Sequence, residues 1–289
     1  MVGKESGKVG RIAAPFDFEG RMNFCGQVAD TMNRLVTVLD ARHRHGTAEA
    51  GDDSGEDALF RGCGFLLAKH ASAVVEWTDH EEVKAKYYDE TYEFVRRLLP
   101  SFSVMPSVGH IYRAEDLTED TTLEQRPAQF VHNDYGDDLD EDGAVVNRWC
   151  DLVHGNDRRN QRIVGVNLWR SVSRKPLARM PLAILDRRTI DRDTMRYIKN
   201  PGLHAIGNAT LLPTSDDHEW YFYPHMTRDE VLVFLTYDSD PQSNDLFGSK
   251  GAPFTPTMHT AVAIPDTDHI HQRESVEMRY FAYSPLPGR

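Results

Sequence analysis

The second part of the chain is a succession of short segments rich in β-branched and aromatic residues, divided by Pro, Gly, Asn and Asp. Such segments are typical of β-strands, and the residues between them are typical of turns. Many short strands with turn residues between them predict a sandwich or jelly roll. A doubly wound nucleotide fold is disfavoured because no GxGxxG motif or P-loop follows any strand. The eight expected strands are SVGHIY, QFVHNDY, VGVNLWRSV, LAILDRRTI, EWYFYPH, EVLVFLTYD, HTAVAI and SVEMRYFAY.

The N-terminal third is expected to supply helices that pack on this β-rich part. Two stretches have apolar residues three or four positions apart, which is the spacing of one helical face. Pro100 is expected to end the second stretch. The spaced residues are Phe24, Val28, Met32, Leu35 and Leu39 in the first stretch, and Val83, Tyr87, Thr91, Phe94 and Leu98 in the second.

A single domain, 1–289, is expected from the length of the chain. In it, an N-terminal helical and β packing region, 1–106, would lie against a jelly-roll core, 107–289. A mobile loop is expected at 43–57, where Gly, Ser and charged residues cluster, and one further helix at AVVNRWCDLV.

Composition and charge narrow the class of partner. The net charge of −12 disfavours a surface for nucleic acid or an anionic membrane, because both require basic patches. Cys25, Cys63 and Cys150 are widely separated and are expected to be reduced thiols. The start of the sequence lacks the apolar stretch of a signal peptide, so a cytoplasmic protein that acts on a small molecule is expected.

A histidine and an aspartate end the second expected strand. On an extended strand, residues two apart point to the same face, so His132 and Asp134 can chelate one metal ion. The facial triad of non-haem iron needs a second histidine from a distant strand, and His259 opens a late one. A structural histidine beside a solvated turn is the competing interpretation, because a lone histidine is more often structural than a ligand.

The acidic run after this pair matches the first half of a calcium loop. Asp138, Asp140, Asp142 and Gly143 fit D-x-D-x-D-G, but Trp149 occupies the position of the bidentate glutamate. A solvated acidic loop is therefore expected.

A second pair of residues two apart lies on the last expected strand. Arg273 and Ser275 share a face there, and a guanidinium with a hydroxyl can bind the far carboxylate of a dicarboxylic acid. An alternative uses His269 or His271 as the third metal ligand and Arg279 as the anion-binding residue. Another alternative is that Arg273 only forms a surface ion pair with Glu274 or Glu277.

Several blocks of the chain, spread from about residue 57 to residue 283, occur in the order of a known family. The blocks are GFLLAKHASAVVEW, KYYDETYEFVRRLLP, FVHNDY, VNLWRSV, PLAILD, WYFYPHMTRDEVLVFLTYDSD, HTAV and RESVEMRYFAY. With these blocks the chain resembles the fungal and bacterial hydroxylase/desaturase family, which includes gibberellin-desaturase-like and cephamycin-methoxylation-component-like proteins.

The resemblance implies a mainly β, double-stranded β-helix (a cupin-like jelly roll) with flanking helices. It also implies Fe(II), 2-oxoglutarate and dioxygen, and oxidation of a small secondary metabolite or biosynthetic intermediate by hydroxylation, desaturation or oxidative cyclisation. The implied residues are His132, Asp134 and His259 for iron, Arg273 and Ser275 for 2-oxoglutarate, and Tyr135, Asn167, Trp169, Arg170, Val262 and Arg279 for the substrate pocket. A homodimer is left open because homodimers are common among such folds.

Two positions depart from the family pattern. Ser171 and Val172 follow NLWR where proline is usual, and Val262 follows HTA where phenylalanine is usual. Both departures are expected near the pocket, so they bear on the substrate. Two other classes stay open at this point: a jelly-roll module that only binds a metabolite, and a metal enzyme that needs no oxoacid, such as an isomerase.

Overall fold

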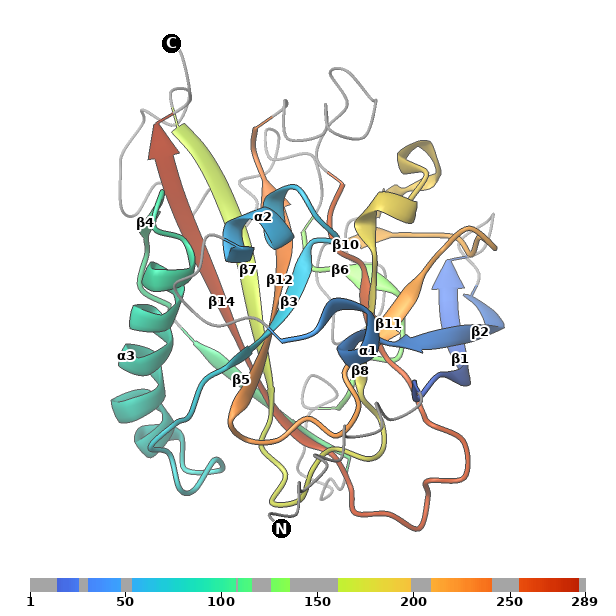
Figure 1. Cartoon of the computed structure of the whole chain (residues 1–289), viewed down its shortest axis with the longest axis horizontal. Coiled ribbons are helices and arrows are strands. Elements are labelled where there is room, and N and C mark those ends of the chain that lie inside the picture. The colour runs from blue at the N-terminus through green and yellow to red at the C-terminus, as the bar shows by residue number, and fades with distance from the viewer. Residues whose placement is uncertain are drawn as a thin grey trace, which may run out of the picture.

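Two β-sheets and one long helix organise the molecule (Figure 1). All eight segments expected as strands contain a strand. The structure is a computed structural model that describes residues 15–25, 31–47, 54–107, 109–115, 126–135, 161–198, 209–240 and 255–285.

Within the described residues, one sheet has six strands, and every pair of neighbours in it is antiparallel. Its order is β3-β12-β7-β14-β4, with β5 also paired to β14. The strands are β3 (Phe65–Lys69), β4 (Ser103–Val104), β5 (His110–Ala114), β7 (Gln161–Ser171), β12 (Glu230–Asp238) and β14 (Glu274–Pro285).

The other sheet has eight strands within the described residues, in the order β1-β2-β11-β8-β13-β6-β10-β9. Its neighbours are antiparallel except for β2 and β11. The strands are β1 (Phe18–Cys25), β2 (Thr31–Asp40), β6 (His132–Asn133), β8 (Leu182–Leu185), β9 (Arg196–Ile198), β10 (Ala209–Leu211), β11 (Trp220–Phe222) and β13 (His259–Ala261). Short 3-10 helices follow β8 at Arg187–Thr189 and Arg192–Thr194.

Both faces of the six-stranded sheet are covered. Side chains alternate between the faces of a strand, so Val166 and Leu168 of β7 pack on the helix side while Trp169 packs between the two sheets. Because both faces are covered, β7 and β12 are buried along almost their whole length.

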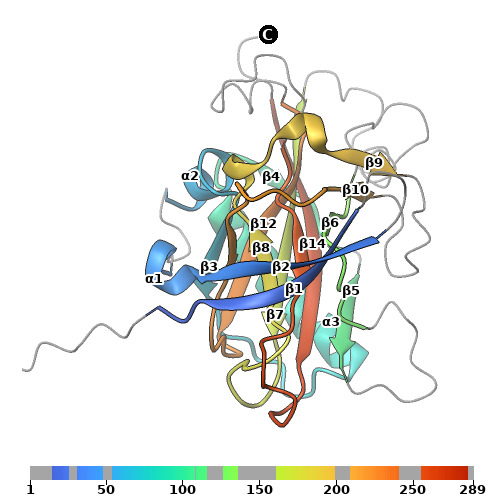
Figure 2. The same ribbon diagram turned by 90° about the vertical axis from the view of Figure 1, so that its right-hand side faces the viewer.

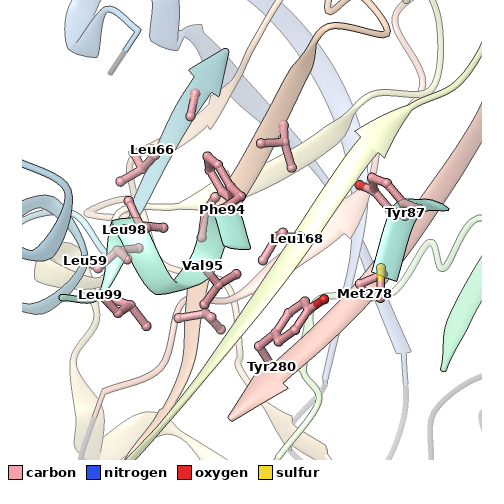
Figure 3. Packing of buried hydrophobic residues seen from close by; sticks show 14 of the residues in the cluster. Leu59, Leu66, Tyr87, Phe94, Val95, Leu98, Leu99, Leu168, Met278 and Tyr280 are labelled. Carbon is pink, nitrogen blue, oxygen red and sulfur yellow. The ribbon is translucent and has the colours of Figure 1, made fainter. Parts of the chain in front are cut away.

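Helix α3 (His80–Leu98) covers the outer face of the six-stranded sheet (Figures 1 and 3). Asp79 caps its start by accepting hydrogen bonds from the backbone N–H groups of Glu81 and Glu82. The helix ends at Leu98, two residues before Pro100, as expected. The predicted apolar stripe is confirmed, because all of its members are buried: Val83, Tyr87, Thr91, Phe94 and Leu98.

The helix expected over residues 24–39 is wrong. Strands β1 and β2 form an antiparallel hairpin there, and β2 also pairs with β11. The hairpin forms one edge of the eight-stranded sheet (Figure 2), and its Phe24 and Val38 are fully buried in a cluster with Trp220. Leu35, which a helical stripe would bury, is 58% exposed. Strand pairing and this burial therefore outweigh the local spacing of the apolar residues.

The loop expected at 43–57 is wrong at both ends. Residues up to His45 belong to α1 (Ala41–His45), and α2 (Ser54–Phe60) begins before the predicted end. Asp40 starts α1 because its carboxylate accepts hydrogen bonds from two backbone N–H groups. Residues 48–53 lie outside the described residues, as do the helix expected at 144–153 and the acidic run from Asp138 to Gly143.

Candidate active site

Strand pairing brings the two predicted histidine ligands together. β6 and β13 are neighbours, and His132 lies directly opposite His259, with 4.4 Å between the ring centroids. Asp134 follows β6, and its Oδ1 lies 3.6 Å from Nε2 of His132. One ligand atom from each of the three residues lies within 4.8 Å of the others. The cluster therefore has the dimensions of a metal site.

Backbone carbonyls orient both rings. Nδ1 of His132 lies 2.6 Å from the carbonyl oxygen of Phe130, and Nδ1 of His259 lies 3.5 Å from that of Thr257. A carbonyl can only accept, so Nδ1 carries the proton and Nε2 keeps its lone pair. Burial, with the nearby His132, lowers the pKa of His259 to about 4. Its imidazole is thus neutral near pH 7, which is the form that binds metals.

Two residues hold the far oxygen of Asp134. Its Oδ2 accepts a hydrogen bond of 2.7 Å from Asn167 and lies 3.2 Å from Nη2 of Arg279. Burial alone would raise the pKa of this carboxyl, but the Arg279 guanidinium holds it well below its usual range. Asp134 is therefore an anion with one oxygen fixed and the other, Oδ1, turned toward the histidines.

Asn133 anchors the short segment that carries the His-x-Asp pair. Its side-chain N–H groups donate to the carbonyls of Tyr135, at 2.7 Å, and Thr236, at 3.1 Å. The register of β12 against β7 shifts between Leu235 and Tyr237, which marks a β-bulge beside the site. Gly165 permits the close packing here, since a Cβ on it would meet Tyr237 and Phe281 at 3.0 Å.

The donor set fits iron. Two imidazoles and one carboxylate that leave other positions open are the facial triad of non-haem Fe(II) enzymes. Among the described residues, this is the one group of three or more potential metal ligands that lie this close together.

Arg273 is a buried cation without a carboxylate partner. It is 1% exposed, and no carboxylate of the described residues lies within 4.0 Å of its guanidinium. Nε and Nη2 donate to Oγ of Ser275 at 3.2 and 3.1 Å, and Nη1 donates to the carbonyl of Met180 at 3.0 Å. The guanidinium lies 4.9 Å from the centre of the Trp169 ring. Burial lowers its pKa to about 9, so a bound carboxylate would be favourable here.

A cavity of about 210 Å³ adjoins the Asp134 side of the cluster. Tyr135 and Arg279 line it, as expected from the sequence, together with Glu277. Glu277 forms an ion pair with Arg279, with 2.8 Å between Oε1 and Nη2. The rest of the wall is largely apolar and includes Met105, Pro106, Ile111 and Phe281.

Four residues expected in the pocket do not line this cavity: Asn167, Trp169, Arg170 and Val262. Arg170 follows Trp169 on β7 and therefore points to the opposite face, where it bonds to His70 and the Tyr87 hydroxyl. Val262 is buried in the outer cluster with Phe24. Arg170 and Val262 lie away from this cavity because sequence order does not show which face of a sheet receives a side chain.

The alternative assignments also fail. His269 is exposed, and neither it nor His271 belongs to the metal cluster. Arg279, the alternative anion-binding residue, is already paired with Asp134 and Glu277. Arg273 forms no surface ion pair with Glu274 or Glu277.

Sequence reasoning missed the roles of Asn133 and Glu277. Asn133 stood between the two predicted ligands, so its position was the available signal. Glu277 offered none, because its partners Arg113, at 3.7 Å, and Arg279 become visible only in the folded sheet.

Fold and site together define the class of non-haem iron oxygenases. Residues 30–283 match the model of the oxidoreductase/YMDC permease-like domain family. The chain belongs to this family.

Curated relatives agree with the resemblance inferred from the sequence. The alpha-ketoglutarate-dependent dioxygenase phiK of Fungal sp. (strain ATCC 74256) is 25% identical over 240 residues, which cover 81% of this chain and 82% of that protein. The hydroxylase/desaturase efuI of Hormonema carpetanum is 26% identical over 251 residues, covering 75% and 82% of the two chains. The gibberellin cluster GA4 desaturase of Gibberella fujikuroi (strain CBS 195.34 / IMI 58289 / NRRL A-6831) is 25% identical over 182 residues, covering 55% and 51%. The family expectation is confirmed.

A solved structure supports the fold. The iron and alpha-ketoglutarate-dependent endoperoxidase NvfI superposes with a TM-score of 0.69 at 18% identity, covering 93% of this chain and 99% of that one. The jelly-roll prediction is confirmed. Within the described residues, no helix has the length and apolar character needed to cross a membrane.

Proposed function

We propose that the chain uses Fe(II), 2-oxoglutarate and dioxygen to oxidise a small secondary metabolite or biosynthetic intermediate. It is a non-haem iron, 2-oxoglutarate-dependent dioxygenase of the hydroxylase/desaturase kind, and its reaction is a hydroxylation, a desaturation or an oxidative cyclisation. The observation that carries this proposal is the buried cluster of His132, Asp134 and His259.

In this proposal the three residues hold Fe(II), and Arg273 with Ser275 binds the far carboxylate of 2-oxoglutarate. The buried guanidinium of Arg273, which has no carboxylate beside it among the described residues, supports the second assignment. A buried charge is stable only when an opposite charge or hydrogen bonds compensate it. When bound, iron and 2-oxoglutarate supply the dioxygen chemistry that removes hydrogen from an unreactive carbon.

The chain itself positions the reactants. Asn167 and Arg279 fix Oδ2 of Asp134, so that Oδ1 faces the metal position. Both histidine rings are buried, so a metal that they hold would lie inside the protein. The cavity beside Tyr135 and Arg279 would hold the substrate, with its apolar part against the wall and a polar group near Arg279.

The domain count, the compartment and the partners are inferred from the length and composition of the sequence. We propose a single oxygenase domain over 1–289 that acts in the cytoplasm, with its cysteines reduced and without a nucleic-acid or membrane partner. The net charge of −12 supports this, as does the lack of a disulfide at Cys25 and Cys63 within the described residues. A homodimer is compatible with it.

An anaerobic titration of the Fe(II)-loaded protein with 2-oxoglutarate tests the proposal. We expect a visible metal-to-ligand charge-transfer band, which forms when the oxoacid chelates iron. His259→Ala should abolish it, and the exposed His269→Ala is the matched control that should keep it. A protein that holds iron but gives no band would contradict chelation of 2-oxoglutarate and favour a metal enzyme that needs no oxoacid.

A further inference from the structure

The inner face of the β7–β14 ladder carries polar residues in register. Asn167 lies opposite Arg279, Trp169 opposite Glu277, and Ser171 opposite Ser275. Residues directly opposite one another in an antiparallel pair point to the same face, with Cβ atoms about 5 Å apart. Ser171 therefore lies beside the serine whose Oγ accepts two hydrogen bonds from Arg273.

Ser171 is fully buried, and its Oγ has no hydrogen-bond partner among the described residues. Nε1 of Trp169, on the same face, has none either. Native proteins rarely leave buried polar groups without a partner, and each exception calls for an explanation such as a ligand. Two unpartnered donors and a guanidinium without a carboxylate thus share one interior face.

The matched serine farther along the chain shows the difference. Oγ of Ser173 accepts a hydrogen bond of 2.9 Å from the backbone of Glu274 and so has a structural role. Ser171 has no such contact, so nothing in the described protein requires its hydroxyl.

We infer that Ser171 is a further binding residue for the oxoacid: its Oγ–H donates to the same distal carboxylate that Arg273 and Ser275 bind. The ligand class is a 2-oxo dicarboxylic acid. This inference rests on the proposed function, and it adds selectivity for oxoacids that carry a second carboxylate.

The test measures the dissociation constant of 2-oxoglutarate by calorimetry on the anaerobic Fe(II)-loaded protein. Ser171→Ala should raise it about tenfold, as expected for a lost hydrogen bond to a charged group. The constant for 2-oxobutyrate, which lacks the distal carboxylate, should stay unchanged. Ser284→Ala, on the other end of β14 and partly exposed, is the control that should leave both constants unchanged.

Thermal unfolding separates a binding role from a structural one. Ser171→Ala should not lower the Tm of the free protein, because its hydroxyl has no partner there. The rise in Tm that 2-oxoglutarate gives should be smaller than in the wild type. A Tm loss in the free protein with an unchanged dissociation constant would overturn the inference and make Ser171 structural.

Comparison of the variants distinguishes failure of the role of Ser171 from failure of the proposed function. If Arg273→Ala weakens 2-oxoglutarate but Ser171→Ala does not, this inference fails and the proposed function stands. If the wild type binds no 2-oxoglutarate, both fail. A tenfold loss for 2-oxobutyrate as well would also overturn the inference, because the effect would not come from the distal carboxylate.

Discussion

Both faces of the β7–β14 ladder carry a buried arginine, but the two arginines differ in their hydrogen-bond partners. On the outer face, Arg170 donates to the Tyr87 hydroxyl at 3.1 Å, and to His70 and the carbonyl of Arg228. It also lies 5.1 Å from the centre of the Tyr87 ring. On the inner face, Arg273 reaches one serine and one carbonyl and has no carboxylate.

This difference shows how one sheet separates folding from binding. On the outer face, the guanidinium of Arg170 is satisfied by neighbouring elements and ties α3 to the sheet. On the inner face, Oγ of Ser171 and Nε1 of Trp169 have no hydrogen-bond partner among the described residues. Substitutions on the inner face should therefore change ligand affinity, and those on the outer face should change stability.

The largest effect is expected at the metal cluster. Asp134→Ala or His132→Ala should weaken Fe(II) binding more than about 100-fold, because loss of a ligand costs more than loss of a residue that supports one. Equilibrium dialysis or calorimetry under anaerobic conditions measures this. His70→Ala, a histidine substitution on the outer face, is the control that should retain iron. Full iron affinity in Asp134→Ala would contradict the ligand assignment.

Replacing each of the two arginines by alanine tests the comparison most directly. Arg273→Ala should weaken 2-oxoglutarate by about 2 to 4 kcal/mol, or roughly 30- to 1,000-fold, because a buried charge pair is lost. Arg170→Ala should instead lower the free energy of unfolding by about 3 kcal/mol, since it leaves buried partners unsatisfied. Calorimetry and urea unfolding of both variants give the answer. The comparison would break if Arg170→Ala reduced oxoacid affinity in the folded protein.

A smaller effect is expected where the inner face supports the metal. Asn167→Ala removes the 2.7 Å hydrogen bond to Oδ2 of Asp134 and should weaken Fe(II) binding about 10- to 100-fold. Asn33→Ala, an exposed asparagine in β2, is the matched control. Iron affinity equal to that of the wild type would reduce Asn167 to a packing residue.

The smallest effect concerns pH and the outer face. Burial, with the Arg170 guanidinium, lowers the pKa of His70 to about 4 from an ordinary value of 6.5. Between these values the unfolded chain binds a proton that the folded chain does not, so stability falls as the pH drops from 6.5 toward 4. Partial exposure of the ring reduces the expected loss to about 1 kcal/mol between pH 7 and pH 5. Urea unfolding at both pH values, compared with His70→Gln, should show a smaller loss in the variant.

The local sequence was sufficient to predict a feature where the spacing of a few nearby residues determines it. The stripe of α3 and the position of Pro100 predicted a helix that the structure contains. The His-x-Asp pair was recognisable because residues two apart on a strand share a face. The helix expected around Leu35 failed because the partner of β2, strand β11, lies far away in the chain.

The sequence by itself determined the strand-rich architecture, the chemistry of the ligand set and the order His132, Asp134, His259, Arg273. The tertiary structure alone decided which face each side chain occupies: Arg170 outside with α3, Asn167 and Ser171 inside. It also decided that Arg279 would pair with both Asp134 and Glu277. The physical reason is that residue type and spacing act over a few residues, whereas burial and charge pairing depend on contacts between strands that are far apart along the chain.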